Sequence, residues 1–146
     1  MRMTMPVTFK LVESQEELIK CFLVRGIVFL EEQHVSHSLE MDEHEYSVLH
    51  FLGQDEMGEP IAASRLRFVE GWAKLERIAV RKKWRGQGYG KKIIRLMLSE
   101  GKKRGFSNFK MNAQAHLVEF YRQFGFEPQG EIFMEANIEH ILMTLK

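Results

Sequence analysis

Three glycines at alternate positions, Gly86, Gly88 and Gly90, stand between an apolar segment and a stretch with helical periodicity. Glycine adopts backbone conformations that other residues avoid, and it removes the side chains that would keep a ligand away from the main chain. The N–H groups of such a turn, together with the positive end of the following helix, form an anion site. The loop therefore predicts a phosphate or pyrophosphate site, although a tight connection between a strand and a helix would use the same glycines.

Two common phosphate-binding loops do not match this segment. A Walker A loop requires Ser or Thr after Gly-Lys, whereas Lys92 follows Gly90 and Lys91 here. The dinucleotide-binding fingerprint requires its third glycine one position later than Gly90. A different phosphate-bearing ligand is therefore indicated.

The glycine loop lies in a strongly basic part of the chain. Residues 81–104 contain ten Lys and Arg and one acid, Glu100, a net charge of +9, while the other eleven basic and nineteen acidic residues give −8. A basic region around a glycine loop suits a polyanionic ligand. Nucleic acid would suit the charge as well, but neither stacking aromatics nor a helix-turn-helix pattern accompanies it, so we do not expect a nucleic-acid partner.

The elements that must position this loop follow from the periodicity of apolar residues. Helices are predicted after Ser14, which with Glu17 forms a capping box, after Gly90, and over the segment around Tyr121 that ends at Gly125. Glu70–Gly71 predicts a hairpin turn. An antiparallel meander then leads into the glycine loop. Strands are predicted over 7–12, 46–52, 61–69, 72–80, 106–112, 126–133 and 138–145.

Composition is that of an ordinary soluble globular chain, with 45% hydrophobic and 28% charged residues among 146. Neither a repeat nor a linker interrupts it, so residues 1–146 are expected to form a single domain. No apolar run is long enough to cross a membrane, and the start lacks the apolar core of a signal peptide. The single cysteine, Cys21, excludes a disulfide framework and predicts a packed apolar residue. A cytoplasmic location is the default expectation.

Two motifs together resemble one enzyme family. Arg85-x-x-Gly88-x-Gly90, after a strand that ends at Val80, resembles the acyl-CoA loop of the GNAT superfamily of N-acetyltransferases, and residues 120–126, Phe-Tyr-x-x-x-Gly-Phe, resemble its other signature. The run 28–33, followed by Glu40, Asp42 and later His50, is similar to the ElaA-like or YjcF-like branch. The resemblance implies an α/β (α+β) fold: a mixed, mostly antiparallel sheet of about six to seven strands flanked by about four helices.

The resemblance also implies an activity, the transfer of an acetyl group from acetyl-CoA to a primary amine by direct attack. An alkyl amine is mostly protonated at neutral pH and must first lose a proton. Glu76 matches the position of a general base, although a salt bridge with Arg77 or Lys74 is an equal alternative. Tyr121 matches the acid that assists the leaving thiolate, and a packed aromatic is its alternative. Cofactor contacts are implied for Ile78, Ala79, Val80, Arg85, Gly86, Gln87, Gly88, Tyr89, Gly90, Lys91 and Asn112.

The segment 31–45 contains six acids and three histidines. The histidines lack the spacing of a zinc motif, so we do not expect a metal. The segment is either a solvated acidic loop or, as the resemblance implies, part of the groove for a cationic acceptor. His140 is either a groove residue or an ordinary strand histidine. The residues predicted to bind the acceptor are Glu32, Gln33, Asp42, His50, Gln114 and His140.

Two other classes of function remain open from the sequence. The chain could hold acyl-CoA without transferring a group, or bind nucleotides or nucleic acid through its basic segment. The sequence does not identify the acceptor, which we expect to be a small molecule or a peptide amine. It leaves the oligomeric state open as well, although a homodimer is common for domains of this size.

Overall fold

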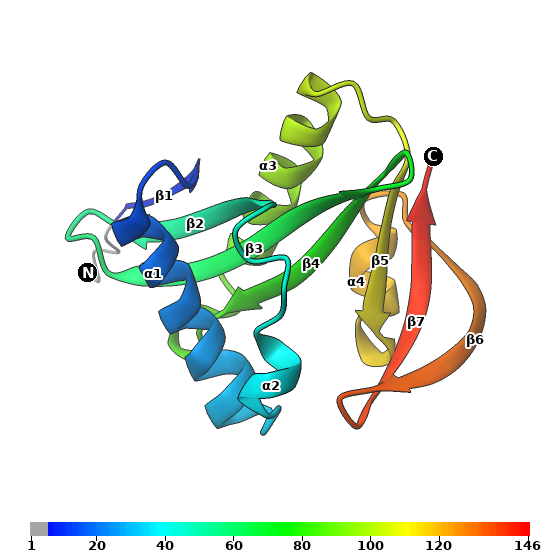
Figure 1. The fold of residues 1–146 in the computed structure, drawn as a ribbon, viewed down its shortest axis with the longest axis horizontal. Coiled ribbons are helices and arrows are strands. Elements are labelled where there is room, and N and C mark those ends of the chain that lie inside the picture. Colours follow the sequence, from blue (N-terminus) through cyan, green and yellow to red (C-terminus); the bar gives the residue numbers. More distant parts are fainter. Residues whose placement is uncertain (1–5) are drawn as a thin grey trace.

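The computed structural model describes residues 6–146 and is built on one seven-stranded sheet (Figure 1). The strand order is β1-β2-β3-β4-β5-β7-β6, and all neighbouring pairs are antiparallel except β4 and β5. This mixed, mostly antiparallel sheet confirms the predicted fold class. The strands are β1 Val7–Leu11, β2 Leu49–Asp55, β3 Pro60–Val69, β4 Trp72–Val80, β5 Phe109–Gln114, β6 Glu127–Glu135 and β7 Ile138–Leu145.

Most predicted strands are confirmed, and β4 and β7 match at both ends. Two begin three residues later than predicted, because a strand needs a partner and not only apolar residues. β5 begins at Phe109, opposite Leu145, the last residue of β7. β2 begins at Leu49, and the residues before it form turns.

The helices begin largely where the sequence predicts. Ser14 caps the first helix, since its Oγ accepts a hydrogen bond from the backbone N–H of Glu17 at 3.2 Å. The Glu17 carboxylate accepts from the N–H of Glu13 at 2.8 Å, so the reciprocal bond of the capping box reaches one residue further back than usual. The helices are α1 Gln15–Arg25, the π-helix η1 Gly26–Glu32, α2 His37–Glu40, α3 Tyr89–Lys103 and α4 Val118–Arg122, with 3₁₀ turns η2 Lys82–Trp84 and η3 Ala115–Leu117.

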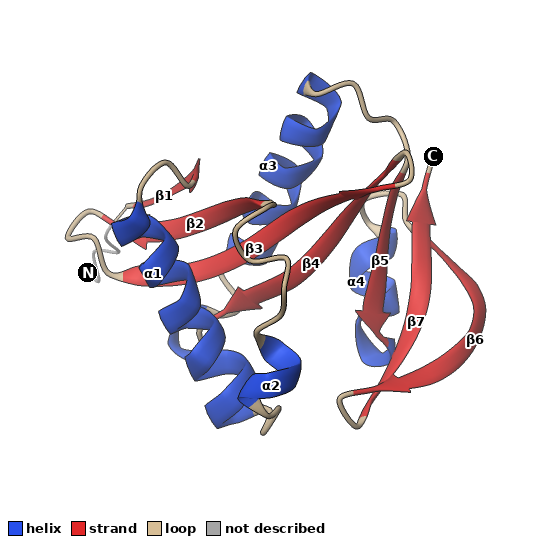
Figure 2. Ribbon diagram, in the orientation of Figure 1, coloured by secondary structure: helices blue, strands red, loops and turns tan. Residues whose placement is uncertain are grey.

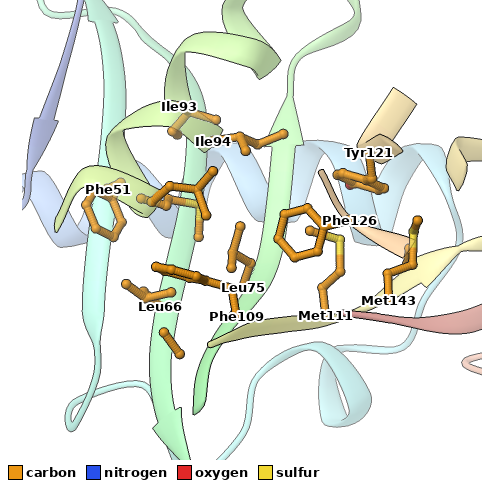
Figure 3. Packing of buried hydrophobic residues seen from close by; sticks show 14 of the residues in the cluster. Phe51, Leu66, Leu75, Ile93, Ile94, Phe109, Met111, Tyr121, Phe126 and Met143 are labelled. Atoms are coloured by element: carbon orange, nitrogen blue, oxygen red, sulfur yellow. The ribbon is translucent and has the colours of Figure 1, made fainter. Parts of the chain in front are cut away.

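Helices cover both faces of the sheet, with α1 and α2 on one face and α3 and α4 on the other (Figure 2). The larger core lies under α3 and α4, where Ile93 and Ile94 pack over the aromatic and aliphatic side chains of the sheet (Figure 3). A smaller core lies under α1 and contains Cys21 and Val24. Burial raises the pKa of the Cys21 thiol to about 12, so this cysteine is the predicted packed residue and a poor nucleophile.

The sheet splits between β4 and β5. These strands pair only at Ala73 with Phe109 and at Lys74 with Lys110 in the described chain. Further along β4, Arg77 has a φ of 56°, and the register with β3 shifts between Ala63 and Arg65. This bulge bends β4 away from β5. Beyond Lys74, the edge of β4 that faces β5 therefore has no strand partner within residues 6–146.

Two helical glycines give a matched test of this packing. A Cβ on Gly101 in α3 would lie 2.6 Å from Cε1 of the buried Phe109 ring, whereas a Cβ on Gly26, which has a helical φ of −62°, would meet nothing within 4 Å. Replacing Gly with Ala at an unstrained helical site stabilises by about 0.5–1 kcal/mol. Overpacking a core costs about 1–3 kcal/mol. In urea denaturation we expect Gly26→Ala to raise the free energy of unfolding and Gly101→Ala to lower it. Equal effects of the two variants would contradict the contact with Phe109.

Candidate active site

A cleft of about 1240 Å³ opens where β4 and β5 separate. Its walls come from β4, the glycine loop with the start of α3, η1, the end of β5 with η3 and α4, and the turn between β6 and β7. The cleft reaches both faces of the sheet. Tyr121 enters it from the core under α3 and α4, whereas Gln33 enters it from η1, on the face covered by α1.

The glycine loop has the backbone that the sequence predicts. Gly86 and Gly88 have φ values of +79° and +83°, which are strained for other residues, and a Cβ at either would meet nothing within 4 Å. These glycines are therefore required by the backbone conformation and not by packing. Gly88 is the N-cap of the 15-residue helix α3, whose first turn lines the cleft through Tyr89, Gly90 and Lys91. The positive end of a long helix therefore faces the cleft.

Glu32, the last residue of η1, and Gln33, its C-cap, connect η1 to two different walls of the cleft. Both Glu32 carboxylate oxygens accept hydrogen bonds from Arg85 of the glycine loop, at 2.6 and 2.7 Å. Arg85 Nε also donates to the Val80 carbonyl at 2.8 Å. Gln33 Oε1 accepts from Gln114 Nε2 at the end of β5, at 3.1 Å. The fold thus brings predicted cofactor residues and predicted acceptor residues together in one site.

Tyr121 lies between the core and the cleft. Its side chain is 6% exposed, packs edge-on against Phe120 at 5.2 Å between ring centroids, and lies in the same cluster as Phe126 (Figure 3). Burial raises the pKa of the Tyr121 phenol to about 12. The phenol therefore keeps its proton at neutral pH and can donate it or a hydrogen bond into the cleft.

Glu76 of β4 lines the cleft but is surrounded by cations. Its Oε1 accepts from Arg65 at 3.0 Å and from Arg67 at 3.1 Å, and its Oε2 lies 3.2 Å from Lys74 Nζ. Burial opposes ionisation, but the hydrogen bond from Arg67 and the charges of Arg65 and Lys74 dominate and lower its pKa to about 2. The predicted salt-bridge alternative is thus present with Lys74. A carboxylate in this state is a weak proton acceptor at neutral pH.

Two buried arginines hold the acidic segment 31–45 against the sheet. Arg25 and Arg65 are each 1% exposed. Arg25 donates to Glu40 at 2.6 Å and to both carboxylate oxygens of Glu45 at 2.8 and 2.7 Å. Arg65 donates to both carboxylate oxygens of Asp42 at 2.8 and 2.6 Å. Because a buried guanidinium requires opposite charges, Glu40, Asp42 and Glu45 neutralise these arginines, while Glu43 of the same segment is 86% exposed. The segment is therefore solvated only in part.

The strained Arg77 fastens α2 to β4. Its Nε donates to the Glu40 carbonyl at 3.0 Å, and its Nη2 donates to the Leu39 carbonyl at 3.3 Å. A left-handed conformation in a strand is costly for arginine and is retained where the surroundings fix it, commonly at functional sites. Arg77, Leu39 and Glu40 all line the cleft.

Most of the predicted site residues line the cleft, and three lie outside its lining. Asp42 is held by Arg65, and its pKa is lowered by that hydrogen bond. His50 lies behind the acidic segment, with Nε2 2.6 Å from the Glu45 carbonyl and its ring edge-on to Phe22. Gln87 is exposed at the tip of the glycine loop. The predicted residues that line the cleft are Glu32, Gln33, Glu76, Ile78, Ala79, Val80, Arg85, Gly86, Gly88, Tyr89, Gly90, Lys91, Asn112, Gln114, Tyr121 and His140.

Several lining residues were not predicted from the sequence. Arg77 was considered only as a salt-bridge partner of Glu76, because a left-handed φ leaves no trace in the residue type. Arg25 and Arg65, which lie behind the cleft and not in its lining, did carry a signal, since each interrupts an apolar stretch of a helix or strand. The unpredicted residues of the lining include Phe29, Val35, Leu39, Trp84, His116, Phe120 and Glu135.

This arrangement, a split sheet with a left-handed glycine loop at the start of a helix, occurs in a chain that matches a known family model. Residues 12–146 match the model of the acetyltransferase (GNAT) domain. The chain belongs to the GNAT acetyltransferase family. The resemblance carried by residues 85–90 and 120–126 is thereby confirmed.

Relatives of this GNAT chain agree in length and fold. It is 38% identical over 133 residues to the uncharacterised N-acetyltransferase YjcF of Bacillus subtilis (strain 168), covering 90% of this chain and 94% of that protein. An acyl-CoA N-acyltransferase from Pseudomonas aeruginosa has 25% identity and a TM-score of 0.85, over 98% of this chain and 100% of that one. Escherichia coli ElaA has 24% identity and a TM-score of 0.86, over 97% and 100% of the two chains.

Two kinds of feature are absent from the described part of this GNAT chain. Within residues 6–146, none of the helices combines the length and the apolar character needed to cross a membrane. Across the same residues, His, Cys, Asp and Glu side chains do not gather in a group of three or more that could hold a metal ion.

Proposed function

We propose that this GNAT protein transfers an acetyl group from acetyl-CoA to a primary amine. The observation that carries the proposal is the meeting of three features in one cleft: the glycine loop, the unpaired edge of β4, and the buried hydroxyl of Tyr121. Each has a separate use for an acyl-CoA thioester, and the cleft joins them across the two faces of the sheet.

The residues present fit a CoA pyrophosphate. The open left-handed backbone at Gly86 and Gly88 lets phosphate oxygens approach the main-chain N–H groups at the start of α3. Arg85 and Lys91 add positive charge at the same end of the cleft. Arg85 is engaged by Glu32, so this charge is partly compensated before a ligand arrives.

The free edge of β4 fits an extended chain. Backbone groups of the segment 76–80 have no strand partner on the β5 side, so an extended ligand arm could pair there as an added strand. We assign this role to the backbone at Ile78 and Val80, opposite Asn112 at the end of β5. The thioester would then lie in the middle of the cleft, within reach of Tyr121.

The side chains have distinct roles in the proposed reaction. The amine attacks the thioester carbonyl from the face covered by α1 and α2, where Glu32, Gln33 and Gln114 line the cleft. Tyr121 donates its proton, or a hydrogen bond, to the CoA thiolate as the carbon–sulfur bond breaks. Glu76, predicted as the base, and His140 both line this side of the cleft.

We further propose that the protein is located in the cytoplasm and that its acceptor is a small molecule or a peptide amine. The homodimer stays a prediction.

Thermal unfolding with acetyl-CoA, CoA, ATP or NAD at equal excess tests the cofactor. A ligand that binds only the folded state at about 100 times its dissociation constant stabilises it by about 2.7 kcal/mol. For a chain of this size we expect both CoA species to raise the melting temperature by roughly 5–10 °C, and ATP and NAD to raise it far less. An equal response to all four ligands, or none to CoA, would contradict the proposal.

Release of CoA thiol with a panel of amines tests the transfer. Release that depends on an added amine supports the acetyltransferase. Binding of acetyl-CoA without amine-dependent release would instead support the alternative of a non-catalytic acyl-CoA module. Strongly salt-dependent binding to DNA or RNA without a response to CoA would support the nucleic-acid alternative.

A further inference from the structure

His140 of β7 is a buried histidine on the wall of the cleft. Its side chain is 7% exposed and lines the cleft, and it pairs in register with Gln114 of β5. Residues directly opposite each other on antiparallel strands point to the same face of the sheet. Gln114 contacts Gln33, the C-cap residue of η1, so His140 lies on the face from which the acceptor amine is proposed to enter.

A backbone carbonyl sets the tautomer of His140. Nδ1 lies 2.7 Å from the carbonyl oxygen of Ile138. A carbonyl oxygen only accepts hydrogen bonds, so Nδ1 must carry the proton in the neutral ring. The lone pair is then on Nε2. A neutral histidine fixed in this way has the form that a general base requires.

A carboxylate stands beside the basic nitrogen. Glu135 Oε2 lies 3.6 Å from His140 Nε2, and Phe133 stacks on the imidazole ring at 6.0 Å between centroids. On the elements packed against β7, the residues that line the same cleft as His140 are Glu135 of β6, His116 of η3, and the uncharged Gln114 and Asn112 of β5. A nearby negative charge stabilises the imidazolium that forms when the ring takes a proton.

Glu76 lacks these properties. Its oxygens already accept hydrogen bonds from Arg65 and Arg67 and pair with Lys74, and its pKa of about 2 keeps it ionised throughout the range of an ordinary assay. A proton on Glu76 would have to displace one of these cations. His140 offers an unshared lone pair, and its partner Glu135 is 49% exposed on the side chain and paired more loosely.

We infer that His140 is the general base that accepts the proton of the acceptor ammonium, with Glu135 as the carboxylate that pairs with the imidazolium once it forms. Nε2 takes the proton, and the amine lone pair released in this way forms the new carbon–nitrogen bond. The carbon–sulfur bond then breaks, the nitrogen of the tetrahedral intermediate loses its second proton to water, and the thiolate takes a proton from Tyr121 or from water. A Tyr121 phenolate formed in this way regains its proton from water. The imidazolium returns its proton to solvent. This inference rests on the proposed acetyltransferase function.

The first part of the test needs no activity. In protein labelled with ¹⁵N-histidine, long-range ¹H–¹⁵N correlation spectra distinguish the two neutral tautomers. The signal of His140 among the six histidines is the one lost in His140→Asn. We expect Nδ1–H for His140 at pH 8. An Nε2–H tautomer overturns the inference even if the protein transfers acetyl groups.

The second part measures kcat against pH at saturating amine, because this profile reports groups in the enzyme–substrate complex. His140→Asn keeps a donor near the position of Nδ1 but lacks the base, so we expect kcat at neutral pH to fall about 100-fold and the acidic limb to disappear. Glu135→Gln removes the carboxylate that lies 3.6 Å from Nε2, so we expect kcat to fall while the KM for acetyl-CoA stays that of the wild type. Exposed His37, which is outside the cleft lining, provides the control His37→Asn, whose profile stays that of the wild type.

Two other outcomes would overturn the role assigned to His140. An acidic limb that persists in His140→Asn but is lost in Glu76→Gln overturns the inference and makes Glu76 the base. A wild-type protein with the Nδ1–H tautomer but without amine-dependent CoA release overturns the proposed function, and with it the role of the base.

Discussion

Tyr121→Phe is expected to lower kcat for acetyl transfer about 100-fold, the lower end of what a positioned acid or base contributes. The variant removes one oxygen and keeps the aromatic ring, which packs edge-on against Phe120 and belongs to the same buried cluster as Phe126. Because burial holds the phenol pKa at about 12, the wild-type group is fully protonated and available as a donor in any ordinary assay. The loss should therefore be in kcat, and the KM for acetyl-CoA should change little.

A control variant tests whether the loss of kcat is specific to the hydroxyl of Tyr121. Tyr46 is 86% exposed and does not line the cleft, so Tyr46→Phe makes the same chemical change away from the site. We expect its kcat to equal that of the wild type. Wild-type kcat in Tyr121→Phe across the pH range would leave Tyr121 as a packed aromatic and require another donor for the thiolate.

Arg25→Ala is expected to lower the free energy of unfolding by about 3–5 kcal/mol, the cost of removing one partner of a buried ion pair. The variant leaves Glu40 and Glu45 buried at 3% and 2% exposure without their guanidinium. Glu45 still pairs with Arg65 at 3.0 Å in this variant. The free energy of unfolding should therefore fall by less than it would if both carboxylates were left without any cation. Urea denaturation at neutral pH measures the change.

Two variants sharpen this test. Arg122 is half-exposed and pairs with Glu119 at 3.5 Å, so Arg122→Ala should change the free energy of unfolding by less than about 1 kcal/mol. Arg25→Lys keeps the charge but loses the planar fork that binds both oxygens of Glu45, and should fall between Arg25→Ala and the wild type. A loss in Arg25→Ala no larger than in Arg122→Ala would show that the arginine is dispensable.

The sequence predicted the glycine loop and its surroundings because the signals there are local. Alternate glycines, a preceding strand and a following amphipathic helix occupy one continuous stretch, and each is a property of residues that are neighbours in the chain. Gly86 and Gly88 indeed adopt left-handed conformations, and α3 begins at Tyr89. The order β2-β3-β4 followed from short connections for the same reason, whereas the place of β1 beside β2 was not predicted.

The acidic segment was harder to interpret because its partners are distant in sequence. Asp42 and His50 were predicted to bind the acceptor, whereas Asp42 pairs with Arg65, 23 residues further on, and His50 lies behind the segment. Carboxylates in a loop are equally suited to a ligand and to a buried arginine. Only packing decides which of the two they meet.

The sequence by itself determined the family, the order of the elements and the backbone of the anion-binding loop, since these depend on residue type and spacing along the chain. The tertiary structure alone decided that Glu76 is surrounded by three cations and that the Ile138 carbonyl fixes the proton of His140 on Nδ1. The physical reason is that the proton affinity of a side chain depends on burial and on the charges and hydrogen-bond partners that surround it in space. Those neighbours come from strands and helices that only folding brings together.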